Sequence, residues 1–241
     1  MHVIAFPGQK GGTGKSTICL NLAVELAQQD YRVVILDADP QGSLSSWYQA
    51  AQAHEEEHPD YKYPTVIGAL DNLKKTLESL APAFDVAMID LPGRDAKIQR
   101  QALMCADTAL LVIAPGSFDI WTLEHTLDYV NQAKELRQER DELLGTDNPL
   151  QAAFIRNRFV AQQNLSKRVS ELLGEVEEPI LESAVSARVA FAEVPAEGIG
   201  VSLYHDKNAA REIKVLTQEI TEKFGISNIY NTIEKSKLPA A

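Results

Sequence analysis

The chain contains very few cysteines and no long apolar segment. Its 241 residues include only Cys19 and Cys105, which do not form a CxxC pair. This count excludes a disulfide-stapled scaffold and is typical of reduced thiols in a cytoplasmic protein. No apolar run approaches the roughly 20 residues that span a bilayer. The first residues, MHVIAF, lead directly into a glycine-rich loop, so we interpret them as a strand and not as a signal peptide.

Positive charge is also scarce. The sequence has 23 Lys and Arg against 34 Asp and Glu, a net charge of -11. This balance argues against a wholly basic protein that wraps nucleic acid, but it leaves room for a local basic patch. There is no internal repeat, low-complexity tract or linker, and we predict a single domain over residues 1–241. The acidic segment HEEEH (54–58) raises the possibility of a metal cluster, but its charge favours a solvated loop.

Short apolar segments alternate with longer amphipathic ones. This alternation predicts an α/β fold, a single doubly wound, mostly parallel sheet with helices on both faces. The expected strands are 2–6, 32–37, 84–90, 107–115 and 151–157. The expected helices are 16–29, 72–81, 122–144, 164–174 and 207–225, the last ending at Gly225.

Residues 8–17, GQKGGTGKST, lie between the first expected strand and the first expected helix. Glycines let backbone N–H groups wrap around a phosphate, and the helix N-terminus adds partial positive charge. Lys15 would reach the β- and γ-phosphates, the Ser16 hydroxyl would bind Mg²⁺, and Thr17 would contact the α-phosphate. The strict G-x-x-x-x-G-K-[ST] pattern fails only at Gln9, and a glycine turn without a ligand is the alternative. The predicted phosphate-binding residues are Gly11, Gly12, Thr13, Gly14, Lys15, Ser16 and Thr17.

A second lysine, Lys10, is unusual in such a loop. It would suffer charge repulsion unless it met anionic oxygens. The stretch KGGTGKST resembles the deviant phosphate loop of the ParA/MinD family of ATPases. The resemblance implies the fold of P-loop NTPases and a homodimer that forms with ATP. It also implies that Lys15 serves its own subunit, whereas Lys10 contacts the phosphates held by the other subunit.

Two acidic segments extend the resemblance. DADPQGS (37–43) places two carboxylates at a strand end, which suits metal or water handling, with a loop cap as the alternative. It resembles the DxDPQ first switch of the family, which implies that Asp39 positions the attacking water and lies at the metal. FDVAMIDLPGR (84–94) resembles a Walker B segment, in which Asp90 would steady Mg²⁺ and Gly93 would be the flexible point of a second switch.

Later segments supply candidates for the purine site. Asn157 ends an expected strand, where its amide could pair with adenine. EVPAEGIGV (193–201) resembles the family loop that packs on the base, which makes Pro195 a candidate. APGSFDIW (114–121) resembles a segment of small plasmid-type ParA proteins, with a helix cap by Ser117 as the alternative. Together these features imply hydrolysis of ATP with Mg²⁺, carried by Lys10, Lys15 and Asp39.

The resemblance also implies a cellular role. The chain begins at the strand before the loop, so we expect the short ParA type without an N-terminal helix-turn-helix domain. Such proteins are cytoplasmic and nucleoid-associated, bind DNA non-specifically as ATP dimers, and act with a ParB-like or other activating partner protein. The implied function is segregation of plasmid or chromosomal DNA, and positioning of a protein cargo on the nucleoid is an alternative. Candidate DNA contacts, each of which could instead be an ordinary solvated charge, are Arg156, Arg158, Lys167, Arg168, Arg188, Lys207, Arg211 and Lys214.

Two other classes are disfavoured. A MinD-like membrane protein needs a basic amphipathic C-terminal helix, and the tail 228–241 is short and ends in Pro-Ala-Ala, so we expect no membrane partner. A carrier like the nitrogenase iron protein needs cysteines at its dimer interface, and neither Cys19 nor Cys105 fits that position.

Overall fold

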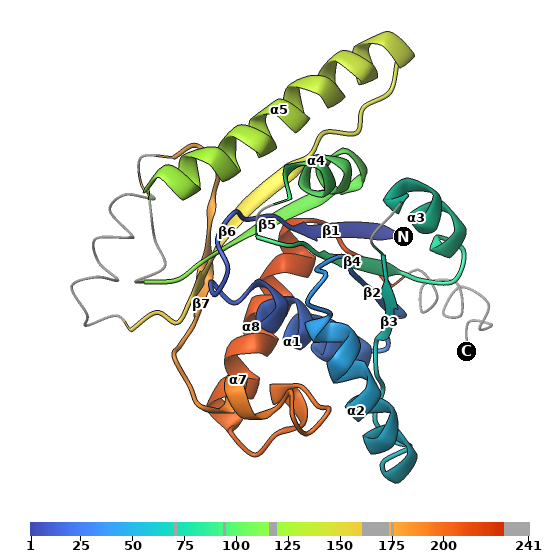
Figure 1. Ribbon diagram of the computed structural model, residues 1–241, viewed down its shortest axis with the longest axis vertical. Helices are drawn as coiled ribbons and strands as arrows, with labels where there is room; N and C mark the ends of the chain where they lie inside the picture. The colour runs from blue at the N-terminus through green and yellow to red at the C-terminus, as the bar shows by residue number, and fades with distance from the viewer. Residues whose placement is uncertain (70–71, 94, 116–119, 161–173, 175, 229–241) are drawn as a thin grey trace, which may run out of the picture.

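The protein is a single parallel sheet with helices on both faces (Figure 1). The computed structural model describes residues 1–69, 72–93, 95–115, 120–160, 174 and 176–228. The sheet has seven strands in the order β3-β2-β4-β1-β5-β6-β7, and every described pairing is parallel. The strands are β1 (His2–Phe6), β2 (Val33–Asp37), β3 (Thr65–Gly68), β4 (Val86–Asp90), β5 (Thr108–Ile113), β6 (Gln151–Asn157) and β7 (Ile180–Val185).

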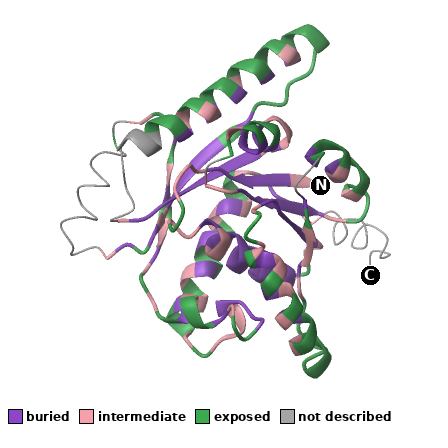
Figure 2. Ribbon diagram, viewed as in Figure 1, coloured by how far each residue is buried: buried purple, intermediate pink, exposed green. Residues whose placement is uncertain are grey.

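The helices divide between the two faces of the sheet. Those of the described residues are α1 (Lys15–Gln28), α2 (Ser43–Glu57), α3 (Leu73–Leu80), α4 (Ala96–Cys105), α5 (Ile120–Leu144), α7 (Ala190–Glu193), α8 (Lys207–Lys223) and the 3-10 helix η1 (Val201–Leu203). One core contains the apolar residues of α1, α2 and α8, and the other contains those of α3, α4 and α5. Figures 1 and 2 show these two helical layers on either side of the buried strands.

Neighbouring positions on each strand face opposite cores. In β1, Ile4 and Phe6 belong to the core under α1, whereas Val3 and Ala5 belong to the core under α4. Side chains on a strand alternate between its faces, so a strand that is apolar at every position is buried on both. The sequence prediction of a doubly wound sheet is therefore confirmed.

Some elements were not anticipated. The segment 54–57 belongs to α2, so the prediction of an acidic loop there is wrong. The helix forms because Leu44, Trp47 and Ala51 recur at helical spacing and are buried against the core. β3, of four residues, and β7, of six, are only partly buried, and no alternation of apolar and polar residues had indicated them. The expected helix 164–174 lies almost wholly outside the described residues.

The strand order brings three chain segments together at one edge. β1 lies between β4 and β5. The chain first adds β2 and β3 on one side of β1, and after β4 it crosses to add β5, β6 and β7 on the other side. Asp90, the last residue of β4, pairs in register with Phe6 of β1 on one side and with Asp37 of β2 on the other. Ligands of such sheets bind beyond the carboxyl ends of the strands at this reversal point. In the part of the chain that the structure describes, no helix is both long enough and apolar enough to cross a membrane.

Candidate functional site

The glycine-rich loop between β1 and α1 is held in place by the end of β6. Gly14, directly before α1, has a φ of 93°. A Cβ at this position would lie 2.2 Å from Nδ2 of Asn157. That amide is buried and donates a hydrogen bond to the Thr13 carbonyl over 2.8 Å. Both the backbone conformation and the close approach therefore require glycine at position 14.

The residue after Asn157 makes a second contact with the loop. Arg158 has a positive φ of 57°, and its Nη1 donates to the Gly12 carbonyl over 3.1 Å. Two successive residues at the end of β6 thus engage two successive carbonyl groups of the loop. Because these contacts use carbonyl oxygens, they leave the N–H groups of the loop for an anion.

Lys15 is a buried cation, and no carboxylate of the described residues is in hydrogen-bond contact with it. Its side chain is 7% exposed, and its Nζ donates to the Lys10 carbonyl over 3.3 Å. Burial lowers the pKa of the Lys15 ammonium, while the Asp90 and Asp39 carboxylates raise it. A buried ammonium that has only a neutral carbonyl partner is stabilised by a bound anion. The Lys10 side chain itself has no hydrogen-bond or ion-pair partner among the described residues.

Two carboxylates meet at the ends of β2 and β4. Asp90 accepts a hydrogen bond from the Ser16 hydroxyl at its Oδ2 over 2.6 Å. Asp37 accepts two hydrogen bonds at its Oδ2, from the backbone N–H and the hydroxyl of Ser45, each over 2.8 Å. The Oδ1 atoms of both aspartates are buried and have no hydrogen-bond partner among the described residues. Unpaired buried carboxylate oxygens are costly unless a cation or water satisfies them.

The environment of Asp90 strongly disfavours its charged form. Burial raises the pKa of Asp90 to about 7, with the hydrogen bond from Ser16 and the charge of Lys15 opposing this and the Asp37 and Asp39 carboxylates adding to it. Oxygen ligands of this kind, two carboxylates and a hydroxyl, are those that Mg²⁺ prefers. The residues therefore fit a Mg²⁺ ion at Ser16 and Asp90, with Asp37 within the same cluster.

The third predicted carboxylate faces a shallow depression beside the loop. Asp39 is half-buried, and its Oδ1 accepts a hydrogen bond from the Gln41 N–H over 2.9 Å. The depression is lined by Asp39 together with Gly11, Pro92 and Gly93. The glycine-rich loop, the segment that follows β2 and the segment that follows β4 thus share one opening. Arg94 lies outside the described residues.

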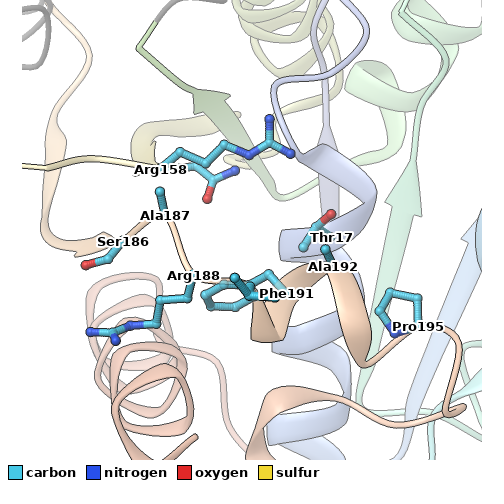
Figure 3. Close-up of a pocket in the computed structure, with 10 residues that line it drawn as sticks. Thr17, Arg158, Ser186, Ala187, Arg188, Phe191, Ala192 and Pro195 are labelled. Atoms are coloured by element: carbon cyan, nitrogen blue, oxygen red, sulfur yellow. The ribbon is translucent and has the colours of Figure 1, made fainter.

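A second hollow, of about 550 Å³, adjoins the start of α1 (Figure 3). Thr17 of α1 lies at one side of it, and Phe191 of α7 and Pro195 lie at other sides. The structure thus brings together Thr17, Asn157 and Pro195, which the sequence proposed for the nucleotide. The lining residues are Thr17, Asn157, Arg158, Ser186, Ala187, Arg188, Val189, Phe191, Ala192 and Pro195.

Apart from Arg158, the basic residues proposed for DNA separate into three groups. Arg156 donates to the carbonyls of Leu181 and Glu182, and Arg188 forms an ion pair with Glu212 over 2.8 Å. In Figure 3 the Arg188 guanidinium points away from the hollow toward α8. A second group, Lys207, Arg211 and Lys214, is exposed along α8. Lys167 and Arg168 lie outside the described residues, as do 116–119 and the tail 229–241.

Sequence reasoning did not assign two residues to this site, Arg158 and Gln99. Arg158 contacts the loop, although its charge had suggested DNA. Gln99 on α4 is 1% exposed and bonds to Gly8 and Pro92. A polar residue beside the buried positions Ile98, Ala102 and Leu103 of α4 is the signal that could have found Gln99.

The fold and these loops define a class of nucleotide-binding protein. The family model of the CobQ/CobB/MinD/ParA nucleotide binding domain matches residues 4–201. The chain therefore belongs to this family, as the phosphate loop had indicated.

Two curated relatives and one solved structure illustrate the range of the family. The chain is 26% identical over 220 residues to the maintenance of carboxysome distribution protein A of Halothiobacillus neapolitanus, covering 90% of this chain and 95% of the relative. It is 27% identical over 252 residues to the chromosome partitioning protein ParA of Myxococcus xanthus, covering 88% of this chain and 84% of the relative. Its fold is similar to the septum site-determining protein MinD of Pyrococcus horikoshii complexed with Mg-ADP, with a TM-score of 0.66, 21% identity and coverage of 93% and 98%.

The contact between Gly14 and Asn157 predicts non-additive stability effects. Gly14→Ala should lower the free energy of unfolding by about 2–4 kcal/mol, because the new Cβ adds steric overlap to an unfavourable positive φ. Adding Asn157→Ala should recover part of this loss, since the side chain that blocks the Cβ is then absent. Urea denaturation of both single variants and the double variant measures this, and strictly additive losses would contradict the contact.

The raised pKa of Asp90 predicts a pH-dependent stability difference. Its folded pKa of about 7 exceeds the ordinary carboxyl pKa of 3.8, so the folded state binds more protons than the unfolded state between these values. Wild-type stability contributed by this group therefore falls as pH rises through that window. Without Mg²⁺, Asp90→Asn should be more stable than wild type by roughly 1–3 kcal/mol at about pH 8, and by much less near pH 5. A difference that does not change with pH, in denaturation at both values, would count against the buried charge.

Proposed function

We propose that this protein is a ParA-type Mg²⁺-dependent ATPase that dimerises with ATP, binds DNA non-specifically and drives segregation of plasmid or chromosomal DNA with a partner protein. The observation that carries the proposal is the meeting of Lys15, Ser16 and Asp90 at the carboxyl ends of the central strands. A metal-bound triphosphate would offer phosphate oxygens to the buried cation, and its metal would bind the hydroxyl and the unpaired carboxylate oxygen.

The loop would bind the phosphates of the nucleotide, and the adjoining hollow would bind its base. The N–H groups of residues 11–17 would hold the phosphates, with Lys15 at the β- and γ-phosphates. The apolar side chains of Phe191 and Pro195 offer a surface for the flat base. The amide oxygen of Asn157 would accept from the adenine amino group, while its Nδ2 keeps the loop in place.

Catalysis would depend on position and charge more than on proton transfer. Ser16 and Asp90 would hold Mg²⁺, which supplies charge neutralisation on the phosphate oxygens when bound. Asp39 would orient a water toward the γ-phosphorus, from the opening that it shares with Gly11 and Gly93. A bond from the water oxygen to phosphorus forms as the bond to the leaving ADP oxygen breaks. The proton of the water ends on phosphate or solvent.

Lys10 is proposed to act on the nucleotide of the partner subunit. Its side chain has no hydrogen-bond or ion-pair partner among the described residues of its own chain, and it belongs to the loop between β1 and α1. A cation at this place could stabilise a second triphosphate across a dimer interface. The same subunit's nucleotide would already be served by Lys15.

This division of labour predicts different defects for the two lysines. Lys10→Ala should bind ATP with an affinity within roughly threefold of wild type but remain a monomer, because only the contact to the other subunit is lost. Lys15→Ala, as the matched variant, should lose ATP binding itself. Equilibrium binding of labelled ATP and light scattering with ATP and Mg²⁺ separate the two effects. If Lys10→Ala still forms a dimer with ATP, Lys10 does not act on the nucleotide of the partner subunit.

The proposed DNA surface is the exposed side of α8. Lys207, Arg211 and Lys214 recur at helical spacing and are exposed, whereas Arg156 and Arg188 are engaged within the chain. Contacts to phosphates need only such a patch, and a dimer would present it twice. The overall charge of -11 means that attraction to DNA must be local.

Replacing this patch should abolish DNA binding without harming the nucleotide site. Lys207→Ala, Arg211→Ala and Lys214→Ala combined should weaken ATP-dependent binding to duplex DNA of arbitrary sequence by roughly tenfold or more and flatten its dependence on salt. The control combines Lys74→Ala and Lys75→Ala, two exposed charges of α3 on the other face of the sheet. Fluorescence anisotropy over a salt series measures both, and equal losses in the two variants would remove α8 from the interface.

A protein assembly is the second candidate cargo. The resemblance to a protein that maintains carboxysome distribution is as extensive as that to a chromosome partitioning protein, with 26% and 27% identity. Both would need the same ATPase, so the cargo would be chosen by the partner. Deleting the gene and following plasmid and chromosome inheritance separates the candidates, because normal inheritance would favour a protein cargo.

A further inference from the structure

The side chain of Gln99 connects two segments of the candidate site from behind. It projects from α4 and is 1% exposed. Its Oε1 accepts a hydrogen bond from the Gly8 N–H over 3.1 Å. Its Nε2 donates to the Gly8 carbonyl and to the Pro92 carbonyl, each over 2.8 Å. A single buried amide thus satisfies three backbone groups of two different segments.

The two segments are those that flank the phosphates and the metal. Gly8 lies in the turn that leads into the phosphate loop, and Pro92 comes two residues after Asp90. The segments also touch next to this bridge, because a Cβ on Gly93 would lie 3.1 Å from the Gly11 nitrogen and 3.2 Å from the Gln9 carbonyl oxygen. The second switch therefore rests on the phosphate loop at Gly93 and is tied to it through Gln99.

We propose that Gln99 is a positioning residue that fixes the second switch against the phosphate loop and thereby sets the turnover rate. The inference rests on the proposed ATPase function, and Gln99 does not touch the nucleotide in this account. Through Gly8 and Pro92 it determines where the backbone of Gly93 stands beside the opening that Asp39 lines. Displacements of about 1 Å near reacting groups cost large factors in rate, so this bridge acts on catalysis more than on binding.

The chemistry of the bridge requires an amide. Gly8 presents both a donor and an acceptor, and Pro92 presents an acceptor, so the bridging group must accept once and donate twice. An ionised carboxylate accepts but donates nothing, whereas a protonated one donates once. Leucine has a similar size and does neither. Replacing Gln99 with leucine therefore removes all three hydrogen bonds, whereas an ionised glutamate removes the two donated bonds and keeps the accepted one.

The test compares Gln99→Leu and Gln99→Glu in the full chain. Both should bind ATP within roughly threefold of wild type, while kcat falls by roughly tenfold or more. The kcat of Gln99→Glu relative to wild type should rise as pH falls from about 8 to about 6, because protonation restores one donor to the bridge. The relative kcat of Gln99→Leu should stay flat over that range.

A matched control distinguishes positioning from general destabilisation. Ile98→Val lies on the same helix and trims an apolar contact without touching Gly8 or Pro92. It should lower stability without lowering kcat. If kcat falls equally in Ile98→Val and Gln99→Leu, or if the relative kcat of Gln99→Glu does not change with pH, the positioning role is overturned.

Hydrogen exchange tests the bridge even if the ATPase proposal fails. The Gly8 amide donates to Gln99, so its exchange should be faster in Gln99→Leu than in wild type and Ile98→Val. A wild-type chain that binds but does not hydrolyse ATP would refute the proposed function and the effect on turnover, while faster exchange would still show the bridge. Unchanged exchange at the Gly8 amide would refute the bridge itself.

Discussion

The rest of the site depends on the negative charge that is buried at the ends of β2 and β4. Asp37 and Asp90 face each other in register, and each keeps one carboxylate oxygen without a hydrogen-bond partner among the described residues. Lys15 is buried nearby, which lowers its pKa, and burial raises that of Asp90 to about 7. Charges of both signs are thus held out of water before any ligand arrives. In the proposed function, a metal-bound polyphosphate would supply the cation and the anion that these groups lack.

The fold holds this arrangement from three sides. The parallel register of β1, β2 and β4 aligns the strand ends, and the apolar layers on both faces fix the strands. From β6, Asn157 and Arg158 hold the carbonyls of the phosphate loop. From α4, Gln99 joins the loop to the segment after Asp90. Rigid support of this kind is what allows a loop with little side chain to present a defined site.

Sequence reasoning predicted what depends on neighbours in the chain. The strand and helix on either side of the glycine-rich loop, the strand that ends at Asp90 and the doubly wound sheet follow from local spacing and apolar runs, and they are confirmed. The binding of phosphate by the loop stays a prediction. Contacts between distant segments left no such mark. Nothing local indicates that Arg188 pairs with Glu212 or that Arg158 bonds to Gly12, so the family resemblance together with their basic charge had suggested DNA. The helix over 54–57 was missed because its acidic end outweighed the buried positions of the preceding turns.

The most direct test of this account is the Mg²⁺ dependence of ATP binding. Calorimetry with a non-hydrolysable ATP analogue, at about pH 8, would compare the dissociation constant in Mg²⁺ with that in a chelator. If the buried carboxylates and Ser16 form a metal site, removal of Mg²⁺ should weaken binding by roughly tenfold or more, since Asp90 would then face the phosphates uncompensated. Equal affinity under both conditions would contradict the claim that a cation binds at Asp37 and Asp90.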